Sequence, residues 1–384
     1  MKRLSSLVAA ALLAAACTAP QAQLTKSGLD PKDFESTYNG KPTALYTLTN
    51  EAGMEVCITN FGGRIVSIMV PDRNGEFRDV VLGFDKVSDY FPENNKTDFG
   101  ACIGRYANRI DHGRITIDGE NYQLSQNNTV HCLHGGETGW QYQVYEAAEV
   151  TPTSLKLVIN SPDGDNGFPG NVVASCTYTL TEDNKIDMVY EATTDKATVV
   201  NMTNHSYFNL SGDPANHSIC DDLLQVNAST FTPSDSTFMT TGEIVPLEEH
   251  PAFDFRTAKT IGQDINADDI QLRNGKGYDH NWVLDTGRDI TVPALTITCP
   301  GTGICLTEYT DEPGVQIYTG NFLDGTVTGK KGVAYAFRTA VCVESQKYPD
   351  SPNKPQWPSA LLRPGETYRS HTVFAFGIAD AVAE

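Results

Sequence analysis

The fold is indicated most directly by the stretch Met54-Glu-Val-Cys-Ile-Thr-Asn-Phe-Gly-Gly-Arg-Ile-Val-Ser-Ile-Met-Val70. In its first half, apolar residues at positions 54, 56 and 58 alternate with residues 55, 57 and 59, which is the period-two pattern of a β-strand. The glycine pair at 62–63 interrupts this pattern, and a second alternating run follows over residues 64–70. Both faces of the second run are partly apolar, as expected for a strand that is buried on both sides.

Similar strand-like runs recur along most of the chain, separated by turn-forming glycines and prolines. They occupy residues 155–159, 172–180, 186–192, 223–226, 290–297, 304–309, 315–318, 333–343 and 367–376. A hairpin is predicted where Ile115 and Ile117 precede Asp118-Gly119, with Tyr122 and Leu124 beyond the turn. Many short strands joined by turns predict an all-β sandwich.

Helical periodicity is scarce. The best candidate for a helix is residues 260–267, in which Ile261 and Ile265 are four residues apart. The chain has 384 residues, which is enough for one large domain or two ordinary ones. Because no linker-like change in composition follows residue 32, we predict one large single-domain β-sandwich over residues 33–384.

The composition limits the class of partner. Apolar residues make up 40% of the chain and charged residues 20%, which fits a globular protein with a sizeable core. The formal net charge is −20, whereas a nucleic-acid-binding protein is expected to carry a basic surface. The same acidity argues against a strongly anionic substrate such as a sugar phosphate.

The N-terminus has the features of an export signal. A positively charged start precedes an apolar, alanine-rich segment at residues 4–16, which is too short to cross a bilayer. Three alanines stand directly before Cys17 and resemble a bacterial lipobox. We predict a signal and lipobox segment over residues 1–17, a polar linker over residues 18–32, and a lipid anchor at Cys17. Ordinary cleavage near Ala22 is the alternative, and both place the mature protein outside the cytoplasm, in the periplasm or cell envelope.

Several common chemical motifs are absent from the sequence. There is no P-loop, no H-E-x-x-H and no G-x-S-x-G, and the eight cysteines after Cys17 form no C-x-x-C pair. The pair His131-Cys-Leu-His134 has the spacing of some metal ligands, but no further ligand is obvious nearby. The sequence therefore predicts no metal site.

Two distant segments could together supply an acid and a base. His205 lies within Asn201-Met-Thr-Asn-His-Ser-Tyr-Phe-Asn-Leu210, among side chains that donate and accept hydrogen bonds. Glu344 ends the apolar run in Val341-Cys-Val-Glu-Ser-Gln346. Taken singly, these residues could be a structural histidine and a solvated strand end. If the fold brings them together, they form an acid/base pair.

Other polar and aromatic groups gather in turn-rich stretches. Each has an alternative structural role, as a surface ion pair, a tight turn or an outward strand position. Together they offer a cation, a carboxylate, amides and an aromatic ring, which are the groups that a neutral sugar requires. The candidates are Asn108, Arg109, His134, Tyr207, Asp279 and Gln316.

These motifs, in this order, resemble those of the aldose 1-epimerase (galactose mutarotase) family from about residue 35 to the C-terminus. The matching segments are Gly104-Arg-Tyr-Ala-Asn-Arg-Ile110, Leu133-His-Gly-Gly136, Asn201–Leu210, Gly277-Tyr-Asp-His280, Pro313-Gly-Val-Gln-Ile-Tyr-Thr-Gly-Asn321 and Glu344-Ser-Gln-Lys-Tyr-Pro-Asp-Ser-Pro-Asn353. The resemblance implies the large galactose mutarotase-like β-supersandwich. It also implies chemistry without a metal or an organic cofactor.

By the same resemblance, Glu344 is the general base and His205 the general acid in the interconversion of α and β anomers of free aldohexoses such as glucose and galactose. A glutamate near its ordinary pKa of about 4.3 and a histidine near about 6.5 would supply the two states around neutral pH. Tyr207 is a weaker candidate for contact with the sugar. The groups implied to hold the sugar hydroxyls are Asn108, Arg109, His134, Asp279 and Gln316.

Three alternatives to an aldose 1-epimerase are open. A non-catalytic carbohydrate-binding lipoprotein on the same fold could lose Glu344 or His205, yet both are present. The second alternative is an extracellular glycosidase or lyase with a sandwich domain, but a glycosidase would usually need two carboxylates at the bond that it cleaves, whereas the candidate pair here is a glutamate and a histidine. A sugar-phosphate epimerase would need a cluster of basic residues near these motifs. The expected partner is a free monosaccharide, and we expect a monomer or a weak dimer.

Overall fold

The computed structural model describes residues 24–379. The predicted signal segment, its lipidation site Cys17 and residues 18–23 of the predicted linker lie outside this range. None of the helices within residues 24–379 combines the length and the apolar character needed to span a membrane.

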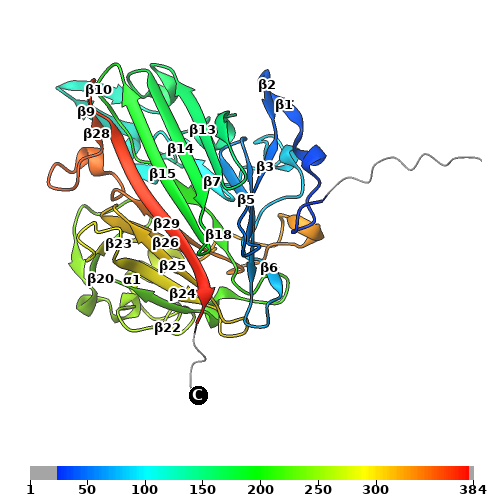
Figure 1. Ribbon diagram of the computed structural model, residues 1–384. Coiled ribbons are helices and arrows are strands. Elements are labelled where there is room, and N and C mark those ends of the chain that lie inside the picture. Colours follow the sequence, from blue (N-terminus) through cyan, green and yellow to red (C-terminus); the bar gives the residue numbers. More distant parts are fainter. Residues whose placement is uncertain (1–23, 380–384) are drawn as a thin grey trace, which may run out of the picture.

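The largest element is a nine-stranded antiparallel sheet, in which the long strands β15 and β29 lie side by side (Figure 1). In spatial order its strands are β12 (Glu146–Val150), β13 (Ser154–Ser161), β14 (Val172–Leu180), β15 (Lys185–Thr194), β29 (Tyr368–Ile378), β25 (Ile304–Thr310), β24 (Pro293–Thr298), β19 (Leu223–Val226) and β22 (Lys259–Thr260). Burial alternates along its strands, because one face covers the core while the other meets solvent.

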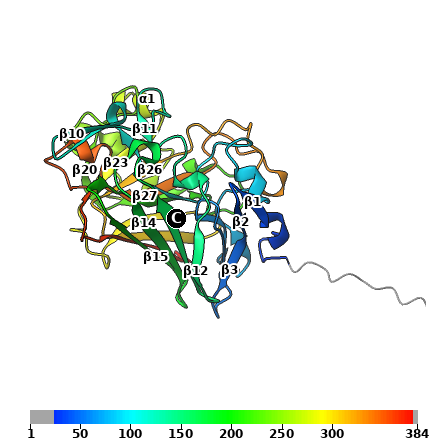
Figure 2. The same ribbon diagram turned by 90° about the horizontal axis from the view of Figure 1, so that it is seen from above.

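Two further sheets cover the inner face of the large one. The six-stranded sheet has the order β18 (Tyr207–Phe208), β27 (Val341–Gln346), β26 (Gly314–Tyr318), β23 (Asp279–Leu284), β20 (Ala228–Thr232) and β21 (Val245–Pro246). The four-stranded sheet has the order β3 (Leu45–Thr49), β4 (Glu55–Thr59), β5 (Arg64–Pro71) and β6 (Phe77–Asp79). Figure 2 shows β26 and β27 beside the layer that contains β14 and β15.

Side-chain contacts hold these layers together. The rings of Phe208 on β18 and Phe374 on β29 meet edge to face, with their centroids 5.1 Å apart. The Ser345 hydroxyl on β27 donates to Glu308 Oε1 on β25 over 2.5 Å. The sandwich is therefore one large sheet faced by two smaller ones around a shared apolar core.

Short pairs of strands and single turns of helix complete the structure. The pairs are β1 (Ser36–Tyr38) with β2 (Lys41–Thr43), β7 (Ala101–Ile103) with β17 (Thr203–His205), β8 (Arg109–Ile110) with β11 (Cys132–Leu133), β9 (Arg114–Ile117) with β10 (Glu120–Gln123), and β16 (Thr198–Val199) with β28 (Leu361–Leu362). Within residues 24–379 the one α-helix is α1 (Ile270–Gly275). The 3-10 turns are η1 (Pro31–Phe34), η2 (Val87–Tyr90), η3 (Asp111–Gly113), η4 (Trp140–Tyr142), η5 (Asp165–Gly167), η6 (Ile219–Asp221), η7 (Leu247–Glu249), η8 (Pro251–Phe253), η9 (Lys330–Gly332) and η10 (Ser351–Asn353).

The structure confirms the predicted β-sandwich and most of its strands. Residues 54–70 form β4 and β5, and both strands are buried along almost their whole length. The predicted hairpin is the β9–β10 pair. The runs at 172–180 and 223–226 coincide with β14 and β19.

Two local predictions are wrong. Residues 261–267 form turns, and the α-helix begins only at Ile270, where the Asp269 side chain accepts a hydrogen bond from Gln271 N–H. Ile261 and Ile265 are both buried, so their spacing reflects two separate core contacts rather than a helical face.

The second error concerns the apolar run at residues 333–343, in which the strand begins only at Val341. Tyr335 in the earlier part packs into the core as a loop residue. Its hydroxyl donates to Gly83 O over 2.8 Å and accepts from Lys330 N–H over 3.0 Å. The backbone of Tyr335 is itself satisfied within the loop, because its N–H donates to Val327 O and its carbonyl accepts from Gly325 N–H, both over 2.9 Å, so it needs no neighbouring strand.

Candidate active site

One cavity of about 490 Å³ collects all eight site residues that the sequence predicts. The eight come from segments that are far apart in the chain, on both sides of residue 200. The lining consists of Asp98, Asn108, Arg109, Asn128, Thr129, Leu133, His134, His205, Tyr207, Ser236, Thr237, Phe238, Asp279, Gln316, Tyr318, Phe322 and Glu344.

Strand register explains why several of these side chains share one wall. Glu344 on β27 pairs directly with Gln316 on the neighbouring β26, so the two side chains lie next to each other on the same face. Asp279 begins β23, the next strand of the sheet, and its Oδ1 accepts a hydrogen bond from Gln316 Nε2 over 2.7 Å. Three successive strands therefore place a carboxylate, an amide and a second carboxylate along one wall.

His205 and Glu344 meet inside the cavity. The Nε2 atom of His205 lies 3.4 Å from Oε1 of Glu344, and their side chains are 6% and 3% exposed. His205 Nδ1 and Glu344 Oε2 have no hydrogen-bond partner among the described residues. Buried polar atoms are normally paired, so the two unpaired atoms mark this pair as unusual in the structure.

Burial changes the charge states that this pair favours. It raises the pKa of Glu344 well above its ordinary value, and the nearby carboxylates of Asp279 and Asp98 add to this rise. Burial also lowers the pKa of His205, although the charge of Asp98 opposes that change. The expectation that both groups titrate near their ordinary values is therefore wrong, because a sequence does not show how deeply they are buried.

His134 lies beside His205 in a defined orientation. Its Nδ1 accepts a hydrogen bond from the backbone N–H of Asn108 over 3.2 Å, so the proton of the neutral ring is on Nε2. Burial lowers the pKa of His134 well below its ordinary value, which keeps the ring neutral. The two imidazole rings meet at 76° with centroids 5.2 Å apart, and the Tyr207 ring stacks on His205 with a centroid distance of 5.0 Å.

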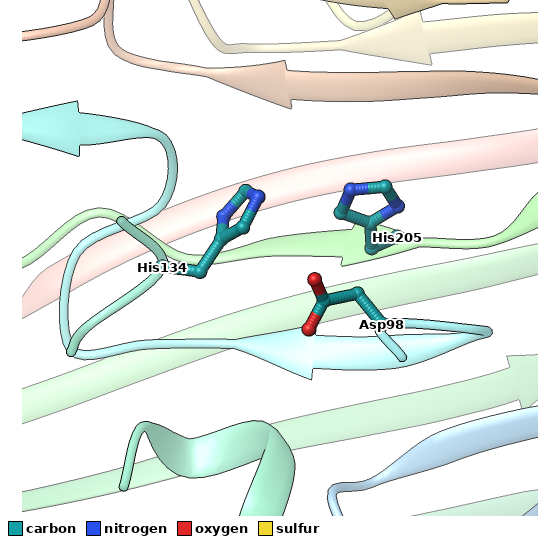
Figure 3. A group of neighbouring side chains, drawn as sticks. All are labelled: Asp98, His134 and His205. Carbon is teal, nitrogen blue, oxygen red and sulfur yellow. The ribbon is translucent and has the colours of Figure 1, made fainter. Parts of the chain in front are cut away.

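Asp98 is the acidic member of this group, and it is absent from the sequence-based candidates. Figure 3 shows its carboxylate directed toward His134 and His205. The three residues place ligand-type atoms within 4.8 Å of one another. Nothing in the sequence distinguishes Asp98 from the other acidic residues, because its neighbours in the chain are not part of the site.

Arg109 provides a buried positive charge in the cavity. Its guanidinium lies over the Phe238 ring, 5.1 Å from the centroid, and its Nε donates to Asn128 Oδ1 over 3.1 Å. Asn108 holds the turn before it, since its backbone is left-handed at φ 65° and its Oδ1 accepts from Arg109 N–H over 2.8 Å. Burial raises the pKa of Asp279, and the charge of Arg109 opposes this rise.

Asn201 joins the segments that carry these groups. Its Oδ1 accepts from Lys347 N–H over 2.9 Å, and its Nδ2 donates to Ala107 O over 3.2 Å. One buried amide thus links the strand that leads to His205 with the end of β27 and with the loop before Arg109. It fixes the relative positions of three parts of the site.

The remaining lining residues show what the sequence did not reveal. Apart from Leu133 on β11 and Tyr318 on β26, they belong to loops without a periodic signal, and the structure brings them to the cavity through contacts distant in the chain. Those outside the predicted set include Asp98, Asn128, Thr129, Leu133, Ser236, Thr237, Phe238 and Phe322. His131 does not join His134, because its Nδ1 accepts from His112 N–H and its Nε2 faces the Thr237 hydroxyl.

Comparison with known proteins assigns the family. The family model for aldose 1-epimerase matches residues 44–375. Galactose mutarotase from Mus musculus is 40% identical over 326 residues, covering 85% of this chain and 92% of that protein. Aldose 1-epimerase from Escherichia coli K12 is 38% identical over 340 residues, covering 88% of this chain and 96% of that protein.

A solved structure agrees with this assignment. The crystal structure of an aldose epimerase homologue from C. elegans has a TM-score of 0.80 and 30% identity, and the match covers 88% of this chain and all of that one. Sequence and fold thus point to the same group of proteins. This chain belongs to the aldose 1-epimerase family.

Proposed function

We propose that this protein is an aldose 1-epimerase that interconverts the α and β anomers of free aldohexoses such as glucose and galactose. The observation that carries the proposal is the contact between His205 Nε2 and Glu344 Oε1 at 3.4 Å inside a polar cavity. Relatives at about 40% identity that bear the names galactose mutarotase and aldose 1-epimerase support it.

The reaction needs one group that removes a proton and one that supplies it. In the proposed mechanism, Glu344 takes the proton from the anomeric O1 hydroxyl while His205 protonates the ring oxygen O5. The C1–O5 bond then breaks to give the open-chain aldehyde. Rotation about C1–C2 presents the other face of the carbonyl, and reclosure with reversed proton transfers gives the other anomer.

The shifted pKa values are compatible with this scheme because the pair needs only one proton. A neutral His205 beside a protonated Glu344 has the same number of protons as an imidazolium beside a carboxylate. The two forms differ by the position of one proton across the 3.4 Å contact. Two groups that interact so closely titrate as a pair rather than separately.

The other cavity groups would hold the sugar. Arg109, Asp279 and Gln316 can donate to or accept from hydroxyls along one side. The Nε2–H of His134 is directed by its Nδ1 contact and can donate to the ring oxygen region or to a hydroxyl. Tyr207 keeps the His205 ring in plane by stacking on it. These roles, with that of Asn108, are part of the proposal.

Optical rotation tests the activity directly. Purified protein lacking residues 1–23 is expected to accelerate the decay of optical rotation of freshly dissolved α-D-glucose or α-D-galactose. The uncatalysed rate in the same buffer is the control. A panel of aldoses that all decay at the buffer rate would contradict the enzymatic function and would leave carbohydrate binding as the remaining role of the cavity.

The pH profile tests the shared proton. Activity is expected to be lost at low pH, where the pair gains a second proton, and at high pH, where it loses its only one. Burial lowers the pKa of His205 below about 6.5 and raises that of Glu344 well above about 4.3. We therefore expect neither limb of the profile of kcat/KM to fall at the ordinary pKa of its group. Limbs at about pH 4.3 and 6.5 would show unshifted groups and contradict this interpretation.

We also propose that the protein is an exported lipoprotein anchored through Cys17. The proposal is supported by the charged start, the apolar segment at residues 4–16 and the small residues before the cysteine. Labelled palmitate is expected to be incorporated into the native chain and lost in Cys17→Ser. Incorporation that persists in this variant would refute the anchor.

A further inference from the structure

A second cluster of reactive side chains lies outside the cavity. His217 Nε2 is 2.8 Å from Asp222 Oδ1 and 3.9 Å from Cys299 Sγ. The three ligand atoms all lie within 4.8 Å of one another. None of these residues lines the cavity that holds His205 and Glu344. The proposed mechanism therefore gives them no role.

The fold holds the three residues together through neighbouring strands. Asp222 directly precedes β19, Cys299 directly follows β24, and these strands pair with Leu223 opposite Thr298. Asp222 and Cys299 thus lie at the same end of two paired strands. The backbone of His217 is fixed as well, because its carbonyl accepts from Asn209 Nδ2 over 3.3 Å and its N–H donates to Asp213 O over 3.0 Å.

The neighbours of the Asp222 carboxylate compensate its burial only in part. Asp222 is fully buried, and its Oδ2 has no hydrogen-bond partner among the residues that the structure describes. A buried carboxylate with one unpaired oxygen is costly, so the space between it and the thiol favours a cation such as a metal ion.

We propose that His217, Asp222 and Cys299 form a binding site for a divalent transition metal, with Zn²⁺ as the fitting ion. Zinc binds imidazole nitrogen and carboxylate oxygen at about 2.0–2.2 Å and thiolate sulfur at about 2.3 Å, so tetrahedral ligands lie about 3.3–3.6 Å apart. The observed separations of 2.8 and 3.9 Å bracket this range. These two separations are therefore within about 0.8 Å of the tetrahedral values, and the third, between Asp222 and Cys299, is at most 4.8 Å.

The nature of the ligands selects the class of ion. A thiolate is a soft ligand, which disfavours Ca²⁺ and Mg²⁺ and suits Zn²⁺. Binding releases to solvent the thiol proton of Cys299 and any proton on the other two ligand atoms, because metal ligands bind in their deprotonated forms. The His217 side chain is 20% exposed, so an ion can reach the site and water can take the fourth position.

Cobalt provides a probe that reports the sulfur ligand. The purified protein, stripped of metal by a chelator, is titrated with Co²⁺ and then with Zn²⁺. We expect about one Co²⁺ per chain, a thiolate-to-cobalt charge-transfer band, and loss of that band as Zn²⁺ displaces the cobalt. The group Asp98, His134 and His205 has no sulfur and cannot give this band. Excess galactose should leave the band unchanged.

Variants assign the band to its ligands. Cys299→Ser should abolish it and weaken Zn²⁺ binding by about 100-fold or more, because loss of a ligand exceeds the 10–100-fold typical of residues that only support one. Cys305→Ser is the matched control and should keep both. If Cys299→Ser does not fold, His217→Gln serves instead, with at least a tenfold loss of affinity expected at unchanged circular dichroism. A titration without the band, a band that persists in Cys299→Ser, or one that galactose removes would overturn the proposal.

Discussion

Glu344→Gln is expected to lower kcat/KM by about 10²–10⁴-fold, the range typical of a positioned proton-transfer group. Glutamine has the size of glutamate but cannot take the O1 proton, and it leaves the contact with Gln316 across the strands sterically unchanged. His205→Asn should cause a loss of the same order. Optical rotation measures the rate, and circular dichroism together with a melting curve shows whether the fold is intact.

A matched substitution separates chemistry from packing. Glu308 is another fully buried carboxylate, it lies on β25, and it does not line the cavity. Glu308→Gln makes the same chemical change and should reduce kcat/KM by less than about tenfold, since it removes no proton-transfer group. Full activity in Glu344→Gln, or equal losses in both variants, would be incompatible with the role proposed for Glu344.

The second large effect concerns stability. Lys347→Met is expected to lower the free energy of unfolding by about 3–5 kcal/mol, because it leaves a buried carboxylate without its cation. Lys347 Nζ contacts Glu312 Oε2 at 2.7 Å, and the two side chains are 8% and 0% exposed. The other oxygen of Glu312 already lacks a partner among residues 24–379. Urea denaturation at neutral pH measures the loss.

Two further variants show whether the buried charge is responsible. Lys185→Met removes an ion pair with Asp183 in which both side chains are exposed, and it should cost less than about 1 kcal/mol. Adding Glu312→Gln to Lys347→Met removes the stranded charge and should restore part of the lost stability. If the double variant is as unstable as the sum of its single changes, the loss comes from packing and not from charge.

Strands could be predicted from the sequence where their own residues determine which side chains are buried. Period-two alternation identified β4, β5 and β14 because each needs only its own side chains to define a buried face. The strand predicted over residues 333–343 was wrong in its first part, because Tyr335 packs into the core from a loop. An alternating pattern does not distinguish such a buried loop residue from a strand residue. Spacing alone likewise made Ile261 and Ile265 look helical.

The residues of the site also fall into those that the sequence could predict and those that it could not. His205 and Glu344 could be proposed from the sequence because their segments carry recognisable groups of polar residues in a fixed order. Asp98 and Phe238 could not, since they reach the cavity from loops without a pattern of their own. The protonation states were also out of reach, because burial by the whole fold sets them.

The pairing of Gln316 with Glu344 determines what a register error of β27 would do to the protein. On β27, Glu344 points into the cavity while its neighbours Val343 and Ser345 point toward the nine-stranded sheet, where Ser345 meets Glu308. A slip of β27 by one residue would exchange these faces, placing a carboxylate in the apolar interior and a serine or valine at the reacting centre. Such a chain would lose its base and much of its stability in one step. A chain with β27 in the wrong register would therefore be both unstable and inactive, and would not persist as a folded but inactive protein.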